Sequence, residues 1–269
     1  MTTGTVVITG AAGGMGRPAA QRFAAQGRPL LLCDLDLARL EALAEELRPA
    51  AGKVDILAAD IAAGDYPAQI VAKLEGAPIS ALVHTAGLSP TMSDGARIFA
   101  VNYDATERLV AGLLPYFEAG GCAVLISSVS AYMLGDPALL EAIRAFVTSG
   151  VRDGIAGYMD HPGMAYAISK RAVIGIVERD APVFGAKGLR IVSIAPGFIA
   201  TPMGNAEAEA NEQLRGLIGM VPQQRMGQGD EIASVAEFLC SPAASYVSGV
   251  DIRVDGGILG LLNTKGGGG

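Results

Sequence analysis

Tyr166 and Lys170 are two side chains whose types and spacing could carry out proton transfer. They stand at positions i and i+4 of a helical stretch, so the phenol and the ammonium project from the same face. A tyrosine hydroxyl has a reference pKa of about 10, and lowering it to about 7 takes about 4 kcal/mol of interaction favouring the phenolate. A partly desolvated lysine beside a second positive charge would supply it. The pair alone also fits an ordinary solvated helix face, so the surrounding elements must decide.

A glycine-rich loop near the N-terminus predicts a phosphate-binding turn. A buried strand is expected over residues 5–9 and a helix over residues 17–25, joined by a loop that contains Gly10, Gly14, Met15 and Gly16. The three glycines allow a tight turn and let the backbone approach a pyrophosphate at the helix N-terminus. A glycine triplet by itself could be a plain loop, but the strand–loop–helix context favours dinucleotide binding.

Asp34 follows the next predicted strand, residues 29–33. A carboxylate at this point can accept hydrogen bonds from both ribose hydroxyls of an adenosine and would repel a 2′-phosphate. Asp34 therefore favours NAD over NADP. The alternative is a helix N-cap for residues 36–47, a role that Asp36 could fill instead.

Further strands are predicted over residues 54–58, 81–84, 123–127, 190–195 and 249–254. Candidate site residues follow four of these strands, namely Asp60, Ile61, Ala86, Gly87, Ser128, Pro196 and Gly197. The carboxyl ends of parallel strands form the edge at which open α/β sheets place ligands. Asn102, Ser128, Tyr166 and Lys170 are thus expected to converge on one cleft. His84 is interpreted as a structural, hydrogen-bonded residue rather than a catalytic one.

Strand–helix alternation from end to end predicts a single α/β domain over residues 1–258. The expected fold is a Rossmann-type, doubly wound parallel sheet of about seven strands with helices on both faces. A long helix is expected to start at Val101-Asn102 and reach about Tyr116. Residues 198–222 read as a partly helical connector, and residues 259–269, which end in Gly266–Gly269, as a flexible glycine-rich tail.

Composition narrows the possible partners. The 269-residue chain carries a net charge of −7, which argues against nucleic acid and acidic membranes, and no apolar run approaches a membrane span. The N-terminus does not resemble a signal peptide. Cys33, Cys122 and Cys240 are scattered, and Cys33 and Cys122 lie in or beside strand-like apolar runs, which favours buried thiols for these two. The expected compartment is the reducing cytoplasm, and the two histidines offer no obvious metal site.

Together these motifs resemble the short-chain dehydrogenase/reductase family over nearly all residues from Thr5 to Gly257. The resemblance rests on Thr9-Gly10-x-x-x-Gly14-x-Gly16, Asp34, Asp60-Ile61, Ala86-Gly87, Val101-Asn102, Ile126-Ser127-Ser128, Tyr166-x-x-x-Lys170 and Pro196-Gly197-x-x-x-Thr201. Within the family, the chain is most similar to bacterial 3α-hydroxysteroid dehydrogenase/carbonyl reductases. The shared segments are Asn102-Tyr103-x-Ala105-Thr106-Glu107 and the run from Ser241 to Val247.

The resemblance implies a catalytic tetrad of Asn102, Ser128, Tyr166 and Lys170. Tyr166 would exchange the proton, Ser128 would hold the substrate oxygen, Lys170 would bind ribose and lower the pKa of Tyr166, and Asn102 would steady a relay water. The implied cofactor is NAD, bound by the glycine loop with Met15, Asp34, Asp60, Ile61, Ala86, Gly87, Tyr166, Lys170, Pro196, Gly197, Ile199 and Thr201. The implied substrate residues are Ser128, Ser130, Tyr166, Phe198 and Met203. One departure is His84-Thr85, where the family commonly has two asparagines.

The leading hypothesis is an NAD-dependent interconversion of a secondary alcohol and a ketone on a small or medium apolar substrate. Cyclic, steroid-like and aromatic substrates are among the candidates. Tyr132, Met133, Phe198 and Met203 suggest an apolar pocket. One alternative is a non-catalytic NAD-binding sensor or partner subunit. The other is a β-ketoacyl-carrier reductase, which Asp34 and the acidic charge disfavour.

An insertion over about residues 130–163 separates Ser128 from Tyr166 by 38 positions, much more than is usual in the family. Apolar spacing predicts a helix over residues 137–149, followed by a glycine- and proline-punctuated return. It could be a plain surface insertion. The sharper hypothesis is that it covers the surface through which family tetramers form, giving a homodimer with the homotetramer as the alternative. Its far end, with Tyr158, Met159 and Met164, would then wall the substrate pocket.

Overall fold

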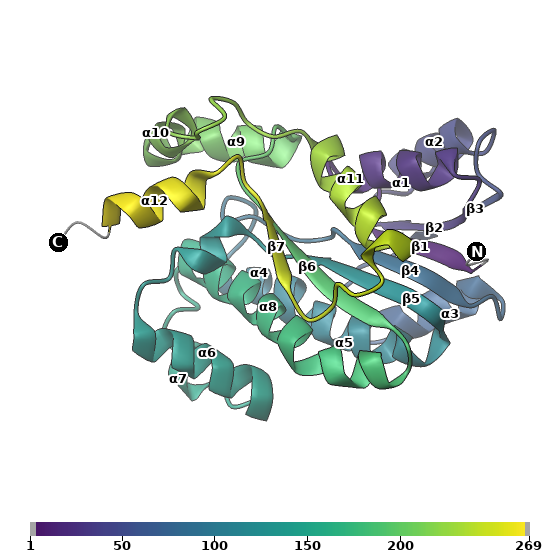
Figure 1. Ribbon diagram of the computed structural model, residues 1–269, viewed down its shortest axis with the longest axis horizontal. Coiled ribbons are helices and arrows are strands. Elements are labelled where there is room, and N and C mark those ends of the chain that lie inside the picture. Colours follow the sequence, from purple (N-terminus) through teal and green to yellow (C-terminus); the bar gives the residue numbers. More distant parts are fainter. Residues whose placement is uncertain (1–3, 267–269) are drawn as a thin grey trace.

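A seven-stranded, wholly parallel sheet forms the centre of the molecule, in the order β3-β2-β1-β4-β5-β6-β7 (Figure 1). The computed structural model describes residues 4–266, with the backbone alone for the last two. The strands are β1 (Thr5–Thr9), β2 (Pro29–Asp34), β3 (Lys53–Ala58), β4 (Ile79–His84), β5 (Phe117–Ile126), β6 (Arg190–Pro196) and β7 (Asp251–Val254). The order reverses between β1 and β4, the point at which doubly wound sheets bind ligands. The predicted fold class is confirmed.

Helices cover both faces of the sheet (Figure 1). One layer contains α1 (Gly16–Ala25), α2 (Leu37–Leu47) and α11 (Gly229–Leu239). The other contains α3 (Tyr66–Leu74), α4 (Gly95–Phe99), α5 (Ala105–Leu113) and α8 (Pro162–Ala186). Successive strand residues point to opposite faces, so Val6 and Ile8 pack in the core under the first layer and Val7 in the core under the second. Both faces are dry, which explains why the strands are nearly continuous apolar runs.

The helix predicted to start at Val101 begins six residues earlier, which corrects the expected boundary. The Asp94 side chain caps α4 by accepting a hydrogen bond from the Arg97 amide at 2.8 Å. The chain then passes through a π-helical turn (Ala100–Asp104) into α5 and ends in a 3₁₀ turn (Leu114–Tyr116). Asn102 therefore lies inside a continuous helical segment, in the kind of bulge that often marks a functional site.

The insertion forms α6 (Pro137–Ser149), over the residues that the apolar spacing predicts, and the short α7 (Asp153–Ala156). Both lie outside α8, at the lower left of Figure 1. Phe146 packs its ring 5.6 Å from that of Phe99 and 4.8 Å from that of Tyr103, between α6 and the π turn. Val147 packs on Gly175 of α8, where a Cβ would lie only 3.0 Å from it. The insertion thus covers the outer surface of the α4 and α8 helices.

The segment after β6 forms α9 (Pro202–Ala210) and α10 (Glu212–Gly219), above the carboxyl edge of the sheet. Beside them lies α12 (Ile258–Gly266), so the flexible tail expected from residue 259 is wrong for residues 259–266. Ile258 and Leu259 are buried against Val129 and Val221, and this apolar contact explains the order. The rest of the predicted tail, residues 267–269, lies outside the described residues.

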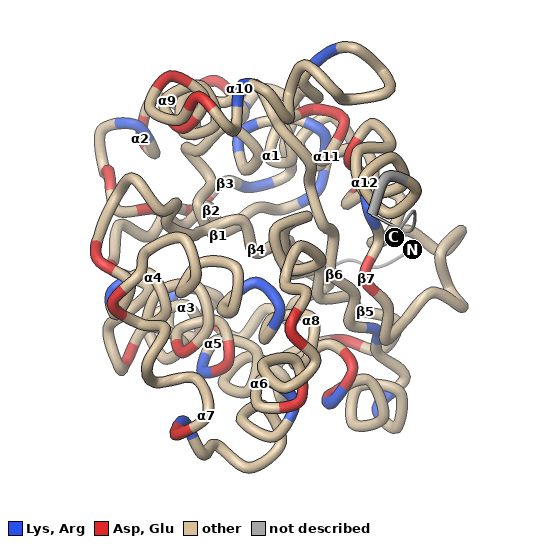
Figure 2. The backbone as a smooth tube through the Cα atoms, turned by 90° about the vertical axis from the view of Figure 1, so that its left-hand side faces the viewer, with Lys and Arg blue, Asp and Glu red and all other residues tan. Residues whose placement is uncertain are grey.

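Charged residues lie mainly on the helices and loops around the sheet (Figure 2). Acidic positions are visible on α9, near the carboxyl edge of the sheet. Within residues 4–266, none of the helices combines the length and the apolar character needed to cross a bilayer.

Candidate active site

Tyr166 and Lys170 project from α8 toward the end of β5, where Ser128 begins a 3₁₀ turn (Val129–Tyr132). The Tyr166 phenol and the Ser128 hydroxyl are hydrogen-bond partners. The Lys170 ammonium is buried and donates a hydrogen bond to the Ile126 carbonyl at 2.9 Å, and it lies 5.8 Å from the centre of the Tyr166 ring. The neighbouring Ser127 hydroxyl has other acceptors, the Ile194 carbonyl at 2.9 Å and the Asp251 carboxylate at 2.6 Å. Three of the four predicted tetrad members therefore meet at one point.

Burial is the main cause of the pKa shifts of Tyr166 and Lys170. It raises the pKa of Tyr166 to about 12; the hydrogen bond from Ser128 opposes this shift, and the Glu207 carboxylate adds to it. Burial lowers the pKa of Lys170 to about 8. The expectation that Lys170 brings the pKa of Tyr166 below 10 is therefore not met in the protein alone. A further positive charge beside the phenol is needed to lower the pKa of Tyr166 below its ordinary value.

Asn102 positions the backbone beside these groups. Its side chain accepts a hydrogen bond from the Leu88 amide at 2.8 Å and donates one to the Leu88 carbonyl at 2.9 Å. A Cβ on Gly87 would lie 3.0 Å from the Asn102 amide oxygen and 3.5 Å from Lys170 Nζ. The absence of a side chain at Gly87 thus lets Asn102 and Lys170 approach the same stretch of backbone.

His84 is the centre of a buried polar chain that ends at Asn102. The Asn102 carbonyl accepts a hydrogen bond from the Thr106 hydroxyl at 2.8 Å. Because that hydroxyl has given its only proton, it accepts from His84 Nε2 at 2.7 Å, and His84 Nδ1 accepts from the Thr9 hydroxyl at 2.6 Å. Every member is satisfied with a neutral imidazole, and burial together with the positive charge of Lys170 lowers the pKa of His84 to about 3. His84 is hydrogen-bonded as the sequence predicts, and it links β1 to the π turn.

The loop between β1 and α1 has the shape of a phosphate cradle. Gly10 adopts φ +66°, and a Cβ there would lie 2.7 Å from the Ala86 amide nitrogen. A Cβ on Gly16 would lie 2.1 Å from the Gly10 carbonyl oxygen, and one on Gly14 would lie 2.4 Å from a Thr201 methyl carbon. The loop therefore needs glycine at these positions, and its amides open at the N-terminus of α1, where a pyrophosphate fits.

Asp34 and Asp60 lie where an adenosine would extend from this loop. Asp34 accepts hydrogen bonds from the Ala12 amide at 2.9 Å and from the Leu35 amide at 2.8 Å, so it is not the N-cap of α2. Asp36 fills that role, with its side chain bound to the Arg39 amide. The Arg39 guanidinium donates to the Ala12 carbonyl, which brings a cation close to Asp34.

Asp60 is held by two groups of the protein itself. It accepts from the Ala62 amide and pairs with Arg97 of α4, both at 2.8 Å, and these contacts lower its pKa. Ile61 is buried beside it. The carboxylate therefore lies at the predicted place, at the end of β3, but the sequence did not indicate its arginine partner.

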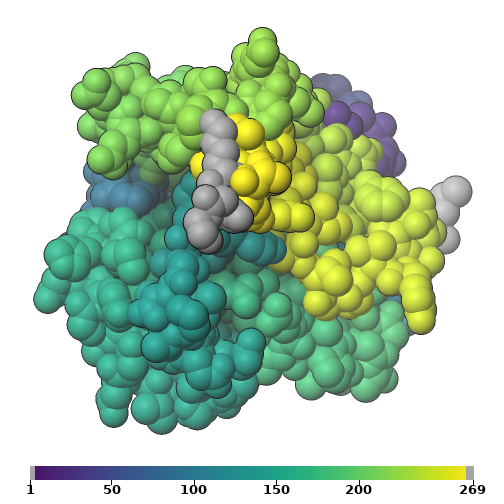
Figure 3. Space-filling view, turned by 60° about the vertical axis from the view of Figure 1, so that its left-hand side comes forward, coloured from purple at the N-terminus to yellow at the C-terminus, as the bar shows by residue number. Residues whose placement is uncertain are grey.

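A cavity of about 100 Å³ lies under α9 and α10, and Figure 3 shows a recess beneath this green segment. Its wall contains predicted site residues, namely Met15, Gly87, Ser128, Tyr166, Lys170, Pro196, Gly197, Phe198, Ile199, Thr201 and Met203. Within the described residues, no cluster of three His, Cys, Asp or Glu side chains could hold a metal ion.

Several predicted pocket residues do not reach this cavity. Ser130 lies outside its wall, and its buried hydroxyl has no hydrogen-bond partner among the described residues. Tyr132 and Met133 are exposed, and the Tyr132 hydroxyl donates to Asp251 at 2.8 Å. Tyr158, Met159 and Met164 pack against the core instead of the cavity. The expected pocket wall from the insertion is therefore wrong, because α6 and α7 run along the outside of α8.

The sequence reasoning missed part of the cavity wall. The additional residues are Thr85, Leu88, Ile126, Ser127, Gly204, Glu207, Leu214, Ile218 and Met226. Leu214 and Ile218 stand four positions apart on α10, a spacing that could have indicated an inward apolar face. Glu207 gives no such signal, because a carboxylate on an alanine-rich helix reads as an ordinary solvated position.

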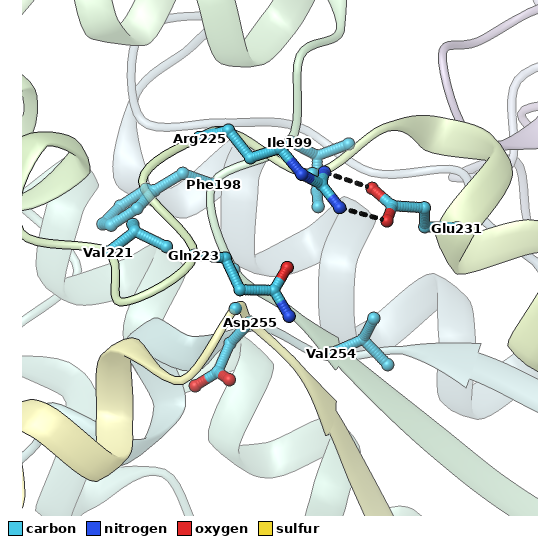
Figure 4. Close-up of a pocket in the computed structure, with 11 residues that line it drawn as sticks. Phe198, Ile199, Val221, Gln223, Arg225, Glu231, Val254 and Asp255 are labelled. Carbon is cyan, nitrogen blue, oxygen red and sulfur yellow. Dashed lines mark hydrogen bonds and ion pairs between the residues drawn. The ribbon is translucent and has the colours of Figure 1, made fainter.

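A second cavity, of about 110 Å³, lies behind the segment Gly197–Ile199, which forms a wall shared with the first (Figure 4). The Gln223 side chain points into it, and Arg225 pairs with both carboxylate oxygens of Glu231 at its rim. Tyr166 and Ser128 lie outside its lining, so the proton-transfer group belongs to the first cavity alone.

The sheet order, the glycine cradle and the Tyr166 group define a Rossmann-fold oxidoreductase that binds a nicotinamide cofactor. Residues 4–137 match the family model described as short chain dehydrogenase, and residues 145–259 match one described as enoyl-(acyl carrier protein) reductase. The chain belongs to the short-chain dehydrogenase family, as the sequence motifs predict.

Relatives of known name support this assignment. A short-chain dehydrogenase/reductase of Alternaria brassicicola is 32% identical and covers 98% of both chains. The 3-alpha-hydroxysteroid dehydrogenase/carbonyl reductase of Comamonas testosteroni is 32% identical over 94% of this chain and 95% of its own. Among solved structures, the 3-alpha-hydroxysteroid dehydrogenase of Pseudomonas sp. B-0831, complexed with NADH, has a TM-score of 0.80 at 25% identity and covers 97% of this chain and 99% of its own.

Proposed function

We propose that this protein is an NAD-dependent dehydrogenase that interconverts a secondary alcohol and a ketone. The observation that carries the proposal is the position of the Tyr166 phenol. It is hydrogen-bonded to Ser128 and lies on the cavity wall beside Lys170. Only a reaction that moves a proton at a substrate oxygen uses this combination of groups. A protein that merely bound the cofactor would have no physical need for it.

Each residue has a defined part in this reaction. The Ser128 hydroxyl holds the substrate oxygen, and Tyr166 gives that oxygen its proton in reduction or takes it in oxidation. A nicotinamide held by the glycine loop and Lys170 would supply or accept the hydride at the substrate carbon. Lys170 would bind the ribose and, together with the positive charge of the oxidised nicotinamide, favour the phenolate, while Asn102 fixes the Gly87–Leu88 backbone beside them.

NAD is favoured over NADP because of Asp34. Its carboxylate lies at the end of β2 and faces the glycine loop, with lone pairs free for ribose hydroxyls beyond its two backbone bonds. A 2′-phosphate at the same place would meet its negative charge. The similar hydroxysteroid dehydrogenase of Pseudomonas, which is complexed with NADH, supports this choice.

The direct test is the purified protein with NAD⁺ and a panel of cyclic and open-chain secondary alcohols, followed by absorbance of the reduced cofactor. We expect turnover with at least one alcohol, and the reverse reaction with the matching ketone and NADH. Tight binding of NADH with no turnover across the panel in either direction would favour the non-catalytic sensor or partner subunit. Turnover of β-ketoacyl carriers alone would favour the carrier reductase.

A further inference from the structure

Among the residues that the structure describes, Glu207 is the one acidic side chain on the wall of the catalytic cavity. It lies on α9, and the other residues that α9, α10 and their flanks place on this wall are mainly apolar, namely Phe198, Met203, Leu214, Ile218 and Met226. Across the cavity stand Tyr166 and Ser128. A carboxylate in such a place is a polar group that the reaction mechanism described above does not use.

The charge of Glu207 is poorly compensated. Its hydrogen-bond partner is the Ser89 hydroxyl, and no Lys or Arg within residues 4–264 forms an ion pair with it. Lys170, the other charged side chain on the wall, directs its ammonium to the Ile126 carbonyl. Burial raises the pKa of Glu207, and the carboxylate in turn raises the pKa of Tyr166. A carboxylate half removed from water in this way favours a cationic partner.

We propose that Glu207 binds a protonated amine of the substrate, so that the protein acts on ketones and secondary alcohols that carry an ammonium group. This inference rests on the dehydrogenase function proposed above and names its substrate class. The ammonium lies against Glu207 under α9, while the carbonyl or carbinol carbon lies against Tyr166 and Ser128, with the apolar residues around the part between them.

Two physical consequences favour a cation over a neutral or anionic group. A charge-assisted hydrogen bond to a carboxylate is about twice as strong as a neutral one, and it offsets the desolvation of Glu207. The cation also screens the negative charge that Glu207 exerts on Tyr166, which favours the phenolate needed for alcohol oxidation. An anionic group at the same place would meet the like charge of Glu207 and is disfavoured.

Three ketones of nearly equal shape test the proposal with the purified protein and NADH at pH 7. N-methylpiperidone is cationic, methylcyclohexanone with its methyl group opposite the ketone is neutral, and the corresponding cyclohexanone carboxylate is anionic. We expect kcat/KM in the order cationic, neutral, anionic, with about a tenfold to hundredfold step between the first two, as for hydrogen bonds to charged groups. Glu207→Gln keeps the shape of the side chain and removes its charge, so it should abolish the difference in kcat/KM between the cationic and the neutral ketone. Glu209→Gln, an exposed position on the same helix, should retain it.

A role of Glu207 in holding α9 closed through Ser89 predicts a different result. Loss of such a latch would lower kcat/KM alike for all three ketones, in Ser89→Ala as in Glu207→Gln. An unchanged ratio between cationic and neutral ketones in Glu207→Gln would overturn the proposal, as would a wild-type protein that prefers the neutral or anionic ketone. Either outcome leaves the dehydrogenase function intact, whereas no turnover of any ketone or alcohol would contradict that function itself.

Discussion

Lys170 and Ile126 are joined by a hydrogen bond of 2.9 Å from the ammonium to the carbonyl oxygen, across 44 positions of the chain. This bond anchors the cation of α8 at the end of β5, two residues before Ser128. It leaves the ammonium two further protons for groups in the cleft. The end of β5 and the inner face of α8 are thus joined directly beside Tyr166.

Tyr166→Phe should lower kcat by about a hundredfold or more, the usual range for loss of a general acid–base group. NADH affinity, followed by its fluorescence, should change little, because the hydroxyl transfers the proton while Lys170 and the glycine loop hold the cofactor. Lys170→Ala should lower both kcat and NADH affinity. Tyr116→Phe, at an exposed tyrosine, is the matched control. A Tyr166→Phe variant with a tenth of the wild-type kcat would show that another group transfers the proton.

Asp34→Ala should narrow the preference for NAD(H) over NADP(H), because it removes the charge that repels a 2′-phosphate. Arg39, whose guanidinium lies beside Ala12, would then be the cation nearest to that phosphate. Steady-state kcat/KM with both cofactors measures the effect. The double variant Asp34→Ala/Arg39→Ala should lose the kcat/KM for NADP(H) that the single variant gained. Its kcat/KM for NAD(H) should stay as low as in the single variant. A wild-type protein with higher kcat/KM for NADP than for NAD would refute the assignment of Asp34.

His84 should make the folded protein sensitive to acid. Its folded-state pKa of about 3 lies below the ordinary value of 6.5, so the unfolded chain takes up the proton first. Stability is therefore full above about pH 6.5 and falls as the pH drops from there toward 3, by about 2 kcal/mol at pH 5 from this group. Urea unfolding at pH 7 and pH 5 measures the loss.

His84→Asn should lose less stability than the wild type between these two pH values, even if it is less stable at both. His161→Asn, at an exposed histidine, is the matched control. An equal loss in His84→Asn and wild type would show that the buried chain from Thr9 to Asn102 does not depend on a neutral imidazole.

We expect a homodimer in solution, with a mass twice the 27.4 kDa of the chain by light scattering after gel filtration. The insertion covers α4, the π turn and α8, where Phe146 packs between Phe99 and Tyr103. The edge strand β7 and its surroundings remain open, with Phe238, Tyr246 and Val250 exposed.

Tyr246→Glu combined with Phe238→Glu should therefore give monomers, while Val151→Glu, at an exposed residue of the insertion, should not. A stable tetramer joined through the helices that carry Asn102 and Tyr166 would contradict this expectation.

The sequence alone determined the features that depend on local spacing. Tyr166 and Lys170 share a helix face because four residues make about one turn, and Gly10, Gly14 and Gly16 form a cradle because a strand and a helix flank them directly. Asp34 and Ser128 reach the site edge because each follows a buried strand, and all parallel strands end at the same edge. The helix of the insertion was also predictable, since its apolar residues repeat with helical period.

Only the tertiary structure decided the contacts between distant segments. Thr9 meets His84 because the sheet places β1 beside β4, and His84, at the end of β4, meets Thr106 of α5 across 22 positions of the chain. Glu207 faces the cavity because α9 crosses above the carboxyl edge, a direction that its own alanine-rich helix does not encode. Such contacts depend on long-range burial, which a local pattern of residues cannot specify.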